Sequence, residues 1–339
     1  MSITTFAEAI DDAQRFKKRH VLLGNGFSIA CRPDIFMYGK LYENADFGSL
    51  SPTAKLAFEA LGTQDFERVI KALRDAEKIL SAYGAHPSLA KTLASDADAL
   101  RELLVQTIAS SHPAWPGDVS EQEYISCRKF IANFDNIYTL NYDLLLYWAQ
   151  MHTPKGESPG SDDGFRKQED NRDAGYVVWE PGQSHGQNMY FLHGALHVFD
   201  AGTEIQKYTW VNTGVRLVDQ IRDALSKGYF PLFVSEGTSG EKLERIRHND
   251  YLAKAYRSFS EITGALFIYG HSLAENDEHF LKRIEKGRLS GVYVGVYGDL
   301  SSESNQKLIS RAKRLVSARA VGRPLQVQFF DAASARVWG

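Results

Sequence analysis

The sequence predicts an α/β fold with a Rossmann-like, mainly parallel sheet covered by helices and an inserted helical subdomain. From residue 135 onward, short apolar runs alternate with helical segments, which is typical of a parallel sheet with helices on both faces. Between residues 51 and 134 the apolar residues instead recur at helical spacing. We therefore expect a sheet domain made of residues 1–50 and 135–339, interrupted by a helical subdomain over 51–134.

The N-terminal part is expected to contain a helix, a strand and then the helical subdomain. Thr5 and Glu8 have capping-box spacing and favour a helix over residues 6–18, and an apolar strand follows at 20–23. Ser120 and Glu123 repeat the capping-box spacing before the last helix of the subdomain. Its two apolar helix faces carry Phe66, Val69, Ile70, Leu73, Ile79 and Leu80, and Leu100, Leu103, Leu104 and Ile108.

The C-terminal part supplies the remaining strands. The strand candidates are residues 136–140, 189–193, 231–235, 265–270, 292–298 and 325–330. Helices are expected between them at 215–228, 250–262 and 305–316. The polar stretch 152–175 contains Gly and Pro, and we expect a surface loop there that is also a candidate lid.

Composition argues against several classes of function. With 39 Lys and Arg against 42 Asp and Glu, the net charge of -3 gives no long-range reason to expect nucleic acid or an anionic membrane as a partner. Cys31 and Cys127 are too few for a disulfide framework. The N-terminus lacks a signal-peptide pattern and no apolar run approaches the ~18 residues of a membrane span. We therefore expect a cytoplasmic protein without direct nucleic-acid or membrane binding.

The stretch Gly24-Asn25-Gly26-Phe27-Ser28 follows the first strand. Gly24 and Gly26 allow a tight turn and close approach of backbone amides to a phosphate, and Ser28 and a helix N-terminus can add donors. An ordinary strand-to-helix turn is the alternative, because a G-x-G pattern alone is weak evidence.

Polar residues also end the second strand, in "YTLNYDLLLYW". Thr139, Asn141 and Asp143 lie between a strand and an apolar helix, where packing alone would favour none of them. Asp143 can cap that helix. The amide of Asn141 needs partners at the end of a buried strand, and a ligand is one possible partner.

His193 ends the next apolar strand and is followed by Gly194, so its imidazole is expected at the carboxyl edge of the sheet, where it could be a general base or a satisfied core histidine. In "IYGHSLAENDEHF", Gly270 and Ser272 could approach a ligand, while Asp277 is expected to begin the next helix. Glu278 and His279 could look like metal ligands, but they are adjacent and would point about 100° apart on a helix. No metal-binding motif is present, so the sequence predicts no metal.

Taken in order, these stretches resemble the sirtuin-like (Sir2-like) superfamily. "GNGFS" is similar to the family's G-A-G-x-S loop, with Asn25 in place of alanine, "TLNYD" is similar to T-Q-N-x-D, and "LHG" to the catalytic His-Gly. "GHSLAENDEHF" resembles the G-Y-S-x-x-D-x-H element of a bacterial branch, and "YGDL" falls where the family's late strand reaches the adenosine ribose. The resemblance covers residues 20–300.

Protein-deacylating sirtuins carry a zinc on two C-x-x-C pairs, which Cys31 and Cys127 cannot supply. The chain therefore looks more like the zinc-free NAD hydrolases of bacterial phage defence.

The resemblance implies a substrate, a reaction and roles for residues. NAD would be the substrate, no metal would be needed, and the bond between nicotinamide and ribose would be cut. Asn141 and His193 would be the catalytic pair, and Asp143 would orient the carboxamide or hold the helix start. Gly24, Gly26 and Ser28 would cradle the pyrophosphate, and Asn25 would contact the ligand or accommodate a left-handed turn. The residues implied around the adenosine half are Gly270, Ser272 and Tyr297.

Two other classes of function are compatible with the same residues. The chain could be a non-catalytic sensor that binds NAD or ADP-ribose, or a zinc-free deacylase or ADP-ribosyltransferase. Family precedent further implies a homo-oligomer that is held silent until an external partner acts. That partner would be an ATPase encoded alongside or a phage-derived trigger.

Overall fold

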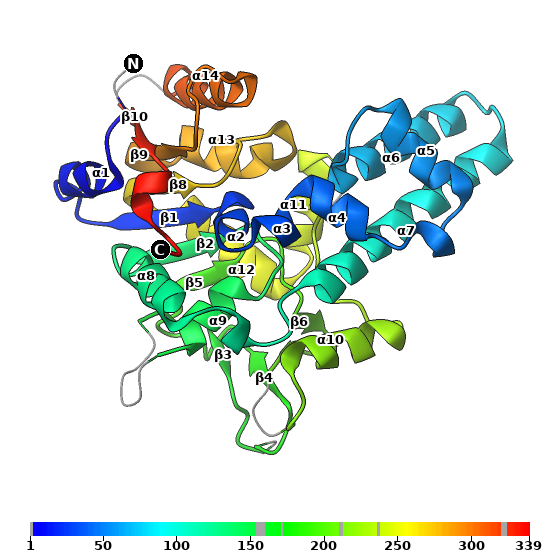
Figure 1. Cartoon of the computed structure of the whole chain (residues 1–339), viewed down its shortest axis with the longest axis horizontal. Coiled ribbons are helices and arrows are strands. Elements are labelled where there is room, and N and C mark those ends of the chain that lie inside the picture. The colour runs from blue at the N-terminus through cyan, green and yellow to red at the C-terminus, as the bar shows by residue number, and fades with distance from the viewer. Residues whose placement is uncertain (1–2, 154–159, 171, 210–212, 236–237, 320–323) are drawn as a thin grey trace.

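The computed structural model describes residues 3–339 except 154–159, 171, 210–212, 236–237 and 320–323. Its centre is a six-stranded parallel sheet with the strand order β10-β9-β8-β1-β2-β5 (Figure 1). Taken along the chain, this is the 3-2-1-4-5-6 order of a doubly wound, Rossmann-type sheet. The predicted α/β class is therefore confirmed. The strands are β1 (Arg19–Leu23), β2 (Asn136–Thr139), β5 (Met189–Phe191), β8 (Thr263–Tyr269), β9 (Arg288–Val296) and β10 (Gln326–Asp331).

β1 lies at the point where the strand order reverses. Leu23, its last residue, is in register with Thr139 at the end of β2 and with Tyr269 at the end of β8. Val21 and Leu22 are fully buried, as expected for a central strand covered on both faces. The loops that leave β1, β2 and β8 therefore begin side by side, outside the carboxyl edge of the sheet. Open α/β sheets bind their ligands in the crevice at this position.

Helices flank the main sheet, and local sequence signals account for several of their ends. Thr5 Oγ1 accepts the Glu8 amide at 3.2 Å and Glu8 accepts the Thr5 amide at 2.7 Å, so the first capping box is confirmed. The capping box of Ser120 and Glu123 is confirmed in the same way. The first helix ends at Ala13 rather than at residue 18, because Phe16 turns back onto the core ahead of β1. These helices are α1 (Phe6–Ala13), α2 (Gly26–Cys31), α3 (Pro33–Phe36), α8 (Glu121–Ile131), α9 (Leu145–Met151), α12 (Asp250–Ser260), α13 (Glu278–Lys286) and α14 (Glu303–Ser317).

A group of helices projects from one side of the sheet, at the right of Figure 1. It consists of α4 (Tyr38–Asn44), α5 (Pro52–Ala60), α6 (Phe66–Ala82) and α7 (Pro87–Ser111), and we call it the helical arm. The buried face of α6 carries Phe66, Val69, Ile70 and Leu73. α10 (Leu217–Ser226) packs along α7, whereas α8 packs beside α9 next to the main sheet.

A second, antiparallel sheet was not predicted. Its strands are β3 (Phe165–Arg166), β4 (Tyr176–Trp179), β7 (Ile205–Tyr208) and β6 (Val198–Asp200), in that order. Part of the expected surface loop 152–175 thus contributes a strand, and Asp163 is buried in an ion pair with Lys207; residues 154–159 and 171 lie outside the described residues.

The predicted strand at 231–235 is wrong. Phe233 makes only a single antiparallel bridge to Gly194. The Val234 amide donates to the carbonyl of His193 at 2.9 Å, so this segment covers the end of β5 instead of joining the sheet. The other expected strands and helices are present, with bounds shifted by a few residues. The remaining helices are α11 (Ser239–Arg247) and the 3-10 turns η1 (Phe47–Ser49), η2 (Pro116–Asp118), η3 (Glu275–Asp277) and η4 (Ala333–Ala335).

Among the described helices, none combines the length and the apolar character needed to cross a lipid bilayer.

Candidate functional site

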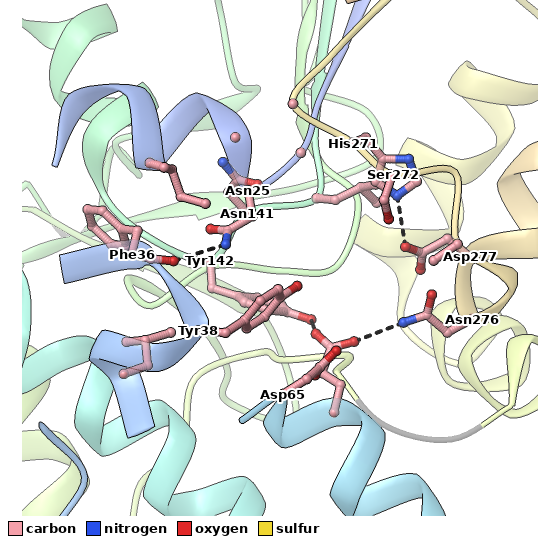
Figure 2. A pocket seen from close by; sticks show the side chains of 18 of the residues that line it. Asn25, Phe36, Tyr38, Asp65, Asn141, Tyr142, His271, Ser272, Asn276 and Asp277 are labelled. Atoms are coloured by element: carbon pink, nitrogen blue, oxygen red, sulfur yellow. Dashed lines mark hydrogen bonds and ion pairs between the residues drawn. The ribbon is translucent and has the colours of Figure 1, made fainter. Parts of the chain in front are cut away.

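A cavity of about 570 Å³ lies outside the carboxyl edge of the sheet, within the usual size range of small-molecule sites. Its walls come from the loops after β1, β2, β5 and β8, and the helical arm adds Tyr38, Asp65 and Glu67. Figure 2 shows Asn25 and Asn141 on one side, and His271, Ser272 and Asp277 on the other. The predicted site residues that line it are Gly24, Asn25, Gly26, Asn141, Asp143, His193, Gly270, Ser272 and Tyr297, and Ser28 is fully buried behind them.

The glycines allow the loop after β1 to pack directly on the loop after β8. The Gly26 amide donates to the Gly270 carbonyl at 2.9 Å. A Cβ on Gly26 would lie 2.5 Å from the Gly270 Cα, and Gly270 itself has a φ of +69°. A side chain at either position would separate the two loops.

Four backbone amides of the first loop, those of Gly24, Gly26, Phe27 and Ser28, already have partners. The Gly24 amide donates to Tyr269 O at 2.9 Å, the Phe27 amide to Gly24 O at 2.9 Å, and the Ser28 amide to Asn25 O at 3.0 Å. With the Gly26 amide also occupied, these groups hold the loop together. The glycines therefore form a floor of the cavity that has no side chains. They do not present a row of free amide donors to a ligand.

Asn25 holds the loop to the end of α3. Its Nδ2 donates to the carbonyl of Phe36 at 3.0 Å (Figure 2). Its φ of -55° and ψ of -26° are right-handed, so the left-handed turn considered for this residue is wrong.

Ser28 connects Asn141 and Asp143 in a buried chain of hydrogen bonds. Ser28 Oγ donates to Asp143 Oδ2 at 2.5 Å and accepts from Asn141 Nδ2 at 2.8 Å. Asp143 Oδ1 accepts the amide of Leu145 at 2.9 Å, so Asp143 also serves the start of α9, as expected. Burial raises the pKa of Asp143, and the hydrogen bonds from Ser28 and the Leu145 amide only partly oppose that shift. The chain fixes the Asn141 side chain at the cavity wall.

We expect Ser28→Ala to lower the free energy of unfolding by about 1–3 kcal/mol, because it removes the buried hydrogen-bond partner of Asp143 Oδ2 and of Asn141 Nδ2. Chemical denaturation followed by circular dichroism measures this loss. Ser226→Ala is the matched control, because the Ser226 hydroxyl is exposed and donates only to a carbonyl of its own helix. An equal, small effect of both substitutions would contradict the role of Ser28.

His193 is a buried, neutral imidazole at the cavity. The residue is 3% exposed, and its Nε2 has no hydrogen-bond partner among the described residues but lies 3.6 Å from Asp277 Oδ1. Burial lowers the pKa of His193 well below its ordinary value, and the nearby Asp277 charge only partly opposes this. The ring therefore carries no charge at neutral pH and has a lone pair available.

Asp277 is the last residue of η3 and directly precedes α13, near the helix start expected for it, but its side chain makes no helix cap. Its Oδ2 lies 3.0 Å from His271 Nε2 (Figure 2). Because His271 Nδ1 accepts the Leu273 amide, His271 Nε2 carries the hydrogen and donates to Asp277. Burial alone would raise the pKa of Asp277, but Lys242 and the two histidines hold it well below its usual range. Asp277 is thus a buried carboxylate anion beside His193.

Two charged residues of the site were missed by the sequence analysis. Lys242 on α11 has a side chain that is 1% exposed, and its Nζ lies 3.4 Å from Asp277 Oδ1 and 3.2 Å from Glu67 Oε2. A sequence signal for Lys242 exists, because it lies one helical turn before the buried Ile246 and so shares its apolar face. Glu67 also accepts from Asn276 Nδ2 at 3.2 Å, and Tyr142 Oη lies 3.4 Å from it. The helical arm therefore reaches the sheet edge through Glu67.

Glu67 should make stability depend on pH. Burial raises its pKa to about 7 from 4.5, and Lys242 cancels only part of that shift. The folded state then binds more protons than the unfolded state between these values, so stability falls as pH rises from about 4.5 to about 7. Relative to Glu67→Gln, wild type should lose about 1–3 kcal/mol over that window in urea unfolding. Glu275→Gln, at an exposed neighbour, is the control, and a parallel pH dependence of all three proteins would contradict the assignment.

Aromatic side chains form the rim of the cavity. Tyr297 follows β9 and is 76% exposed, and Tyr38 on the helical arm is 49% exposed. The carbonyl of Ser272 accepts from Arg311 at 3.2 Å, which holds the loop after β8 to α14. The rim can therefore offer flat apolar faces to a ring system above the polar floor.

A family model described as a domain of unknown function (DUF4917) matches residues 21–338. No curated protein matches the chain.

Proposed function

We propose that this chain, which belongs to the DUF4917 family, hydrolyses NAD to nicotinamide and ADP-ribose. The observation that carries the proposal is the meeting of Asn141 and His193 at one cavity, at the switch point of a Rossmann-type sheet. A buried neutral imidazole beside a carboxylate anion is suited to general base chemistry.

The reaction requires a water molecule, a base and a polar cavity. The bond between C1′ of the ribose and the nicotinamide nitrogen breaks, and its electron pair stays on the nitrogen, so a neutral molecule leaves without being protonated. The water oxygen bonds to C1′ and its proton goes to the base. The enzyme must stabilise an oxocarbenium-like ribose and deliver the water.

His193 would take the proton, from the water or from a ribose hydroxyl. Asp277 lies 3.6 Å from Nε2, so it favours a hydrogen on that nitrogen and stabilises the imidazolium that forms. The lone pair of Nδ1 is then the base. Lys242 keeps Asp277 ionised and thus acts through it.

Asn141 would position the water and the ribose. One hydrogen of its Nδ2 is used by Ser28, which leaves its second amide hydrogen and its Oδ1 for the ligand. Asp143 acts through Ser28 and is a positioning residue.

The rest of NAD would extend over the glycine floor. Gly24, Gly26 and Gly270 bring the loops after β1 and β8 into backbone contact at the cavity. The pyrophosphate would lie against this backbone, beside Asn25 and in front of the buried Ser28. Ser272 and the exposed ring of Tyr297 would lie beside the adenosine half.

The order of the motifs supports a relationship to the zinc-free sirtuin-like NAD hydrolases of phage defence. An enzyme of that kind would work in the cytoplasm, where NAD is found, and would have to be restrained. We further propose that the chain forms a homo-oligomer. Its activity would be switched on by an external partner, either an ATPase or a phage-derived trigger.

The test is release of nicotinamide and ADP-ribose from NAD by the purified full chain, followed by chromatography at low and high protein concentration. Equal amounts of the two products would support hydrolysis. NAD binding without release under all conditions would instead favour a sensor. Acetyl release from an acetylated peptide in step with NAD loss would favour a deacylase, and labelling of protein by ADP-ribose would favour a transferase.

A further inference from the structure

Two buried imidazoles present unpartnered nitrogens to the same carboxylate. His193 and His279 are each 3% exposed, and the Nε2 atom of each has no hydrogen-bond partner among the described residues. One nitrogen of each ring and one oxygen of Asp277 lie within 4.8 Å of one another. A buried polar atom without a partner is costly, so this cluster calls for a ligand.

Neighbouring side chains orient this cluster. Ser239 Oγ lies 3.1 Å from His279 Nδ1 and also accepts the His279 amide at 2.7 Å. If Nδ1 donates to Ser239, the lone pair of His279 is on Nε2. His271 donates to Asp277 Oδ2 and leaves Oδ1 toward His193. Outer hydrogen bonds of this kind are typical of metal sites.

We propose that His193, His279 and Asp277 bind a divalent transition-metal ion of the Zn²⁺ class. Two imidazoles and one carboxylate are a common zinc ligand set, with the fourth position open to water or substrate. A tetrahedral ion needs ligand atoms about 3.3 Å apart. His193 Nε2 and Asp277 Oδ1 are already at 3.6 Å, so a small rotation of the imidazoles closes the site. The sequence shows no metal motif because His193 follows β5, whereas Asp277 and His279 follow β8.

Lys242 limits the affinity of this site. The Lys242 ammonium would compete with the metal ion for Asp277 Oδ1. It also contacts Glu67 and can keep its ion pair with Glu67 when a metal binds. The site is therefore suited to reversible binding and not to a permanently held structural ion.

The consequence for catalysis rests on the proposed function. A metal on His193 Nε2 leaves the hydrogen on Nδ1, so the ring has no lone pair for the water. The ion would thus inhibit NAD hydrolysis, and its removal would restore the base.

The test uses the metal-stripped full chain, titrated with Zn²⁺ by calorimetry and with Co²⁺ by its visible absorption. Wild type should bind one ion with a tetrahedral cobalt spectrum, and Mg²⁺ should not compete. His279→Gln should weaken binding by at least about tenfold. His248→Gln, at the exposed C-cap of α11, is the matched control and should bind like wild type.

Absence of binding in wild type, or equal affinity in His279→Gln, would overturn the proposal. Circular dichroism checks the fold of His279→Gln, and Asp277→Asn is the second variant if that protein is unfolded. Zn²⁺ should also inhibit nicotinamide release by wild type, with reversal by a chelator. If wild type releases no nicotinamide, the binding titrations still decide the metal site, which separates its failure from that of the proposed function.

Discussion

Replacing His193 with alanine should lower kcat for nicotinamide release by about 10²- to 10⁴-fold. Among the described residues that we assign to catalysis, His193 is the only base. Asp277, which lies 3.6 Å from its Nε2, has no other such base to support. NAD affinity should change little, because the glycine floor and the aromatic rim remain. Chromatographic product analysis gives kcat, and calorimetry gives the affinity for NAD.

His197→Ala provides a matched control for this experiment. His197 is also buried and directly precedes β6, but its ring packs against Tyr147 and Phe191, away from the cavity lining. It should lose stability without a comparable loss of kcat per folded molecule. Undiminished release by His193→Ala would refute the assignment of the base.

Gly194→Ala should lower the free energy of unfolding by about 3 kcal/mol or more, the largest stability effect that we predict. Gly194 has a φ of +83°, which disfavours any side chain. A Cβ there would also lie 1.9 Å from the carbonyl oxygen of Leu232, so one backbone segment must move. Because His193 precedes it directly, catalysis should fall as well. Urea unfolding and the NAD assay measure the two effects.

Gly202→Ala is the control that measures backbone strain without a steric clash. Gly202 has nearly the same φ, +84°, but an added Cβ would meet no atom within 4 Å. Gly202→Ala should therefore lower the free energy of unfolding only by the cost of the left-handed backbone, about 1–2 kcal/mol. If both alanine variants lost the same stability, the packing of Leu232 against Gly194 would not matter.

Much of the fold could be predicted because its signals are local. The apolar runs that become β1, β2, β5, β8 and β9 are each followed within two residues by a polar residue or a glycine, and two capping boxes mark helix starts. The carboxyl ends of parallel strands meet at one edge, so strand-end residues such as Asn141 and His193 could be expected to lie together.

Other parts of the site depend on contacts that no local pattern contains. Glu67 and Lys242 come from different helices and meet only when the helical arm lies against the sheet edge. The antiparallel sheet consists of two- to four-residue strands, too short to give a clear alternation. The segment 231–235 has an apolar, strand-like composition, but its tertiary role is to cover Gly194. The Gly26 amide is likewise occupied only because the Gly270 carbonyl lies beside it in the folded chain.

The position of β1 in the sheet also determines when, during synthesis, the cavity can be completed. β1 leaves the ribosome before its neighbour β8, which begins only at Thr263. Until then one edge of β1 is unpaired, and such an edge is a target for chaperones or for aggregation. A chain whose translation stops before β8 lacks Gly270, His271 and Asp277. Under the proposed function, such truncated products would lack the complete site and would leave the NAD pool intact.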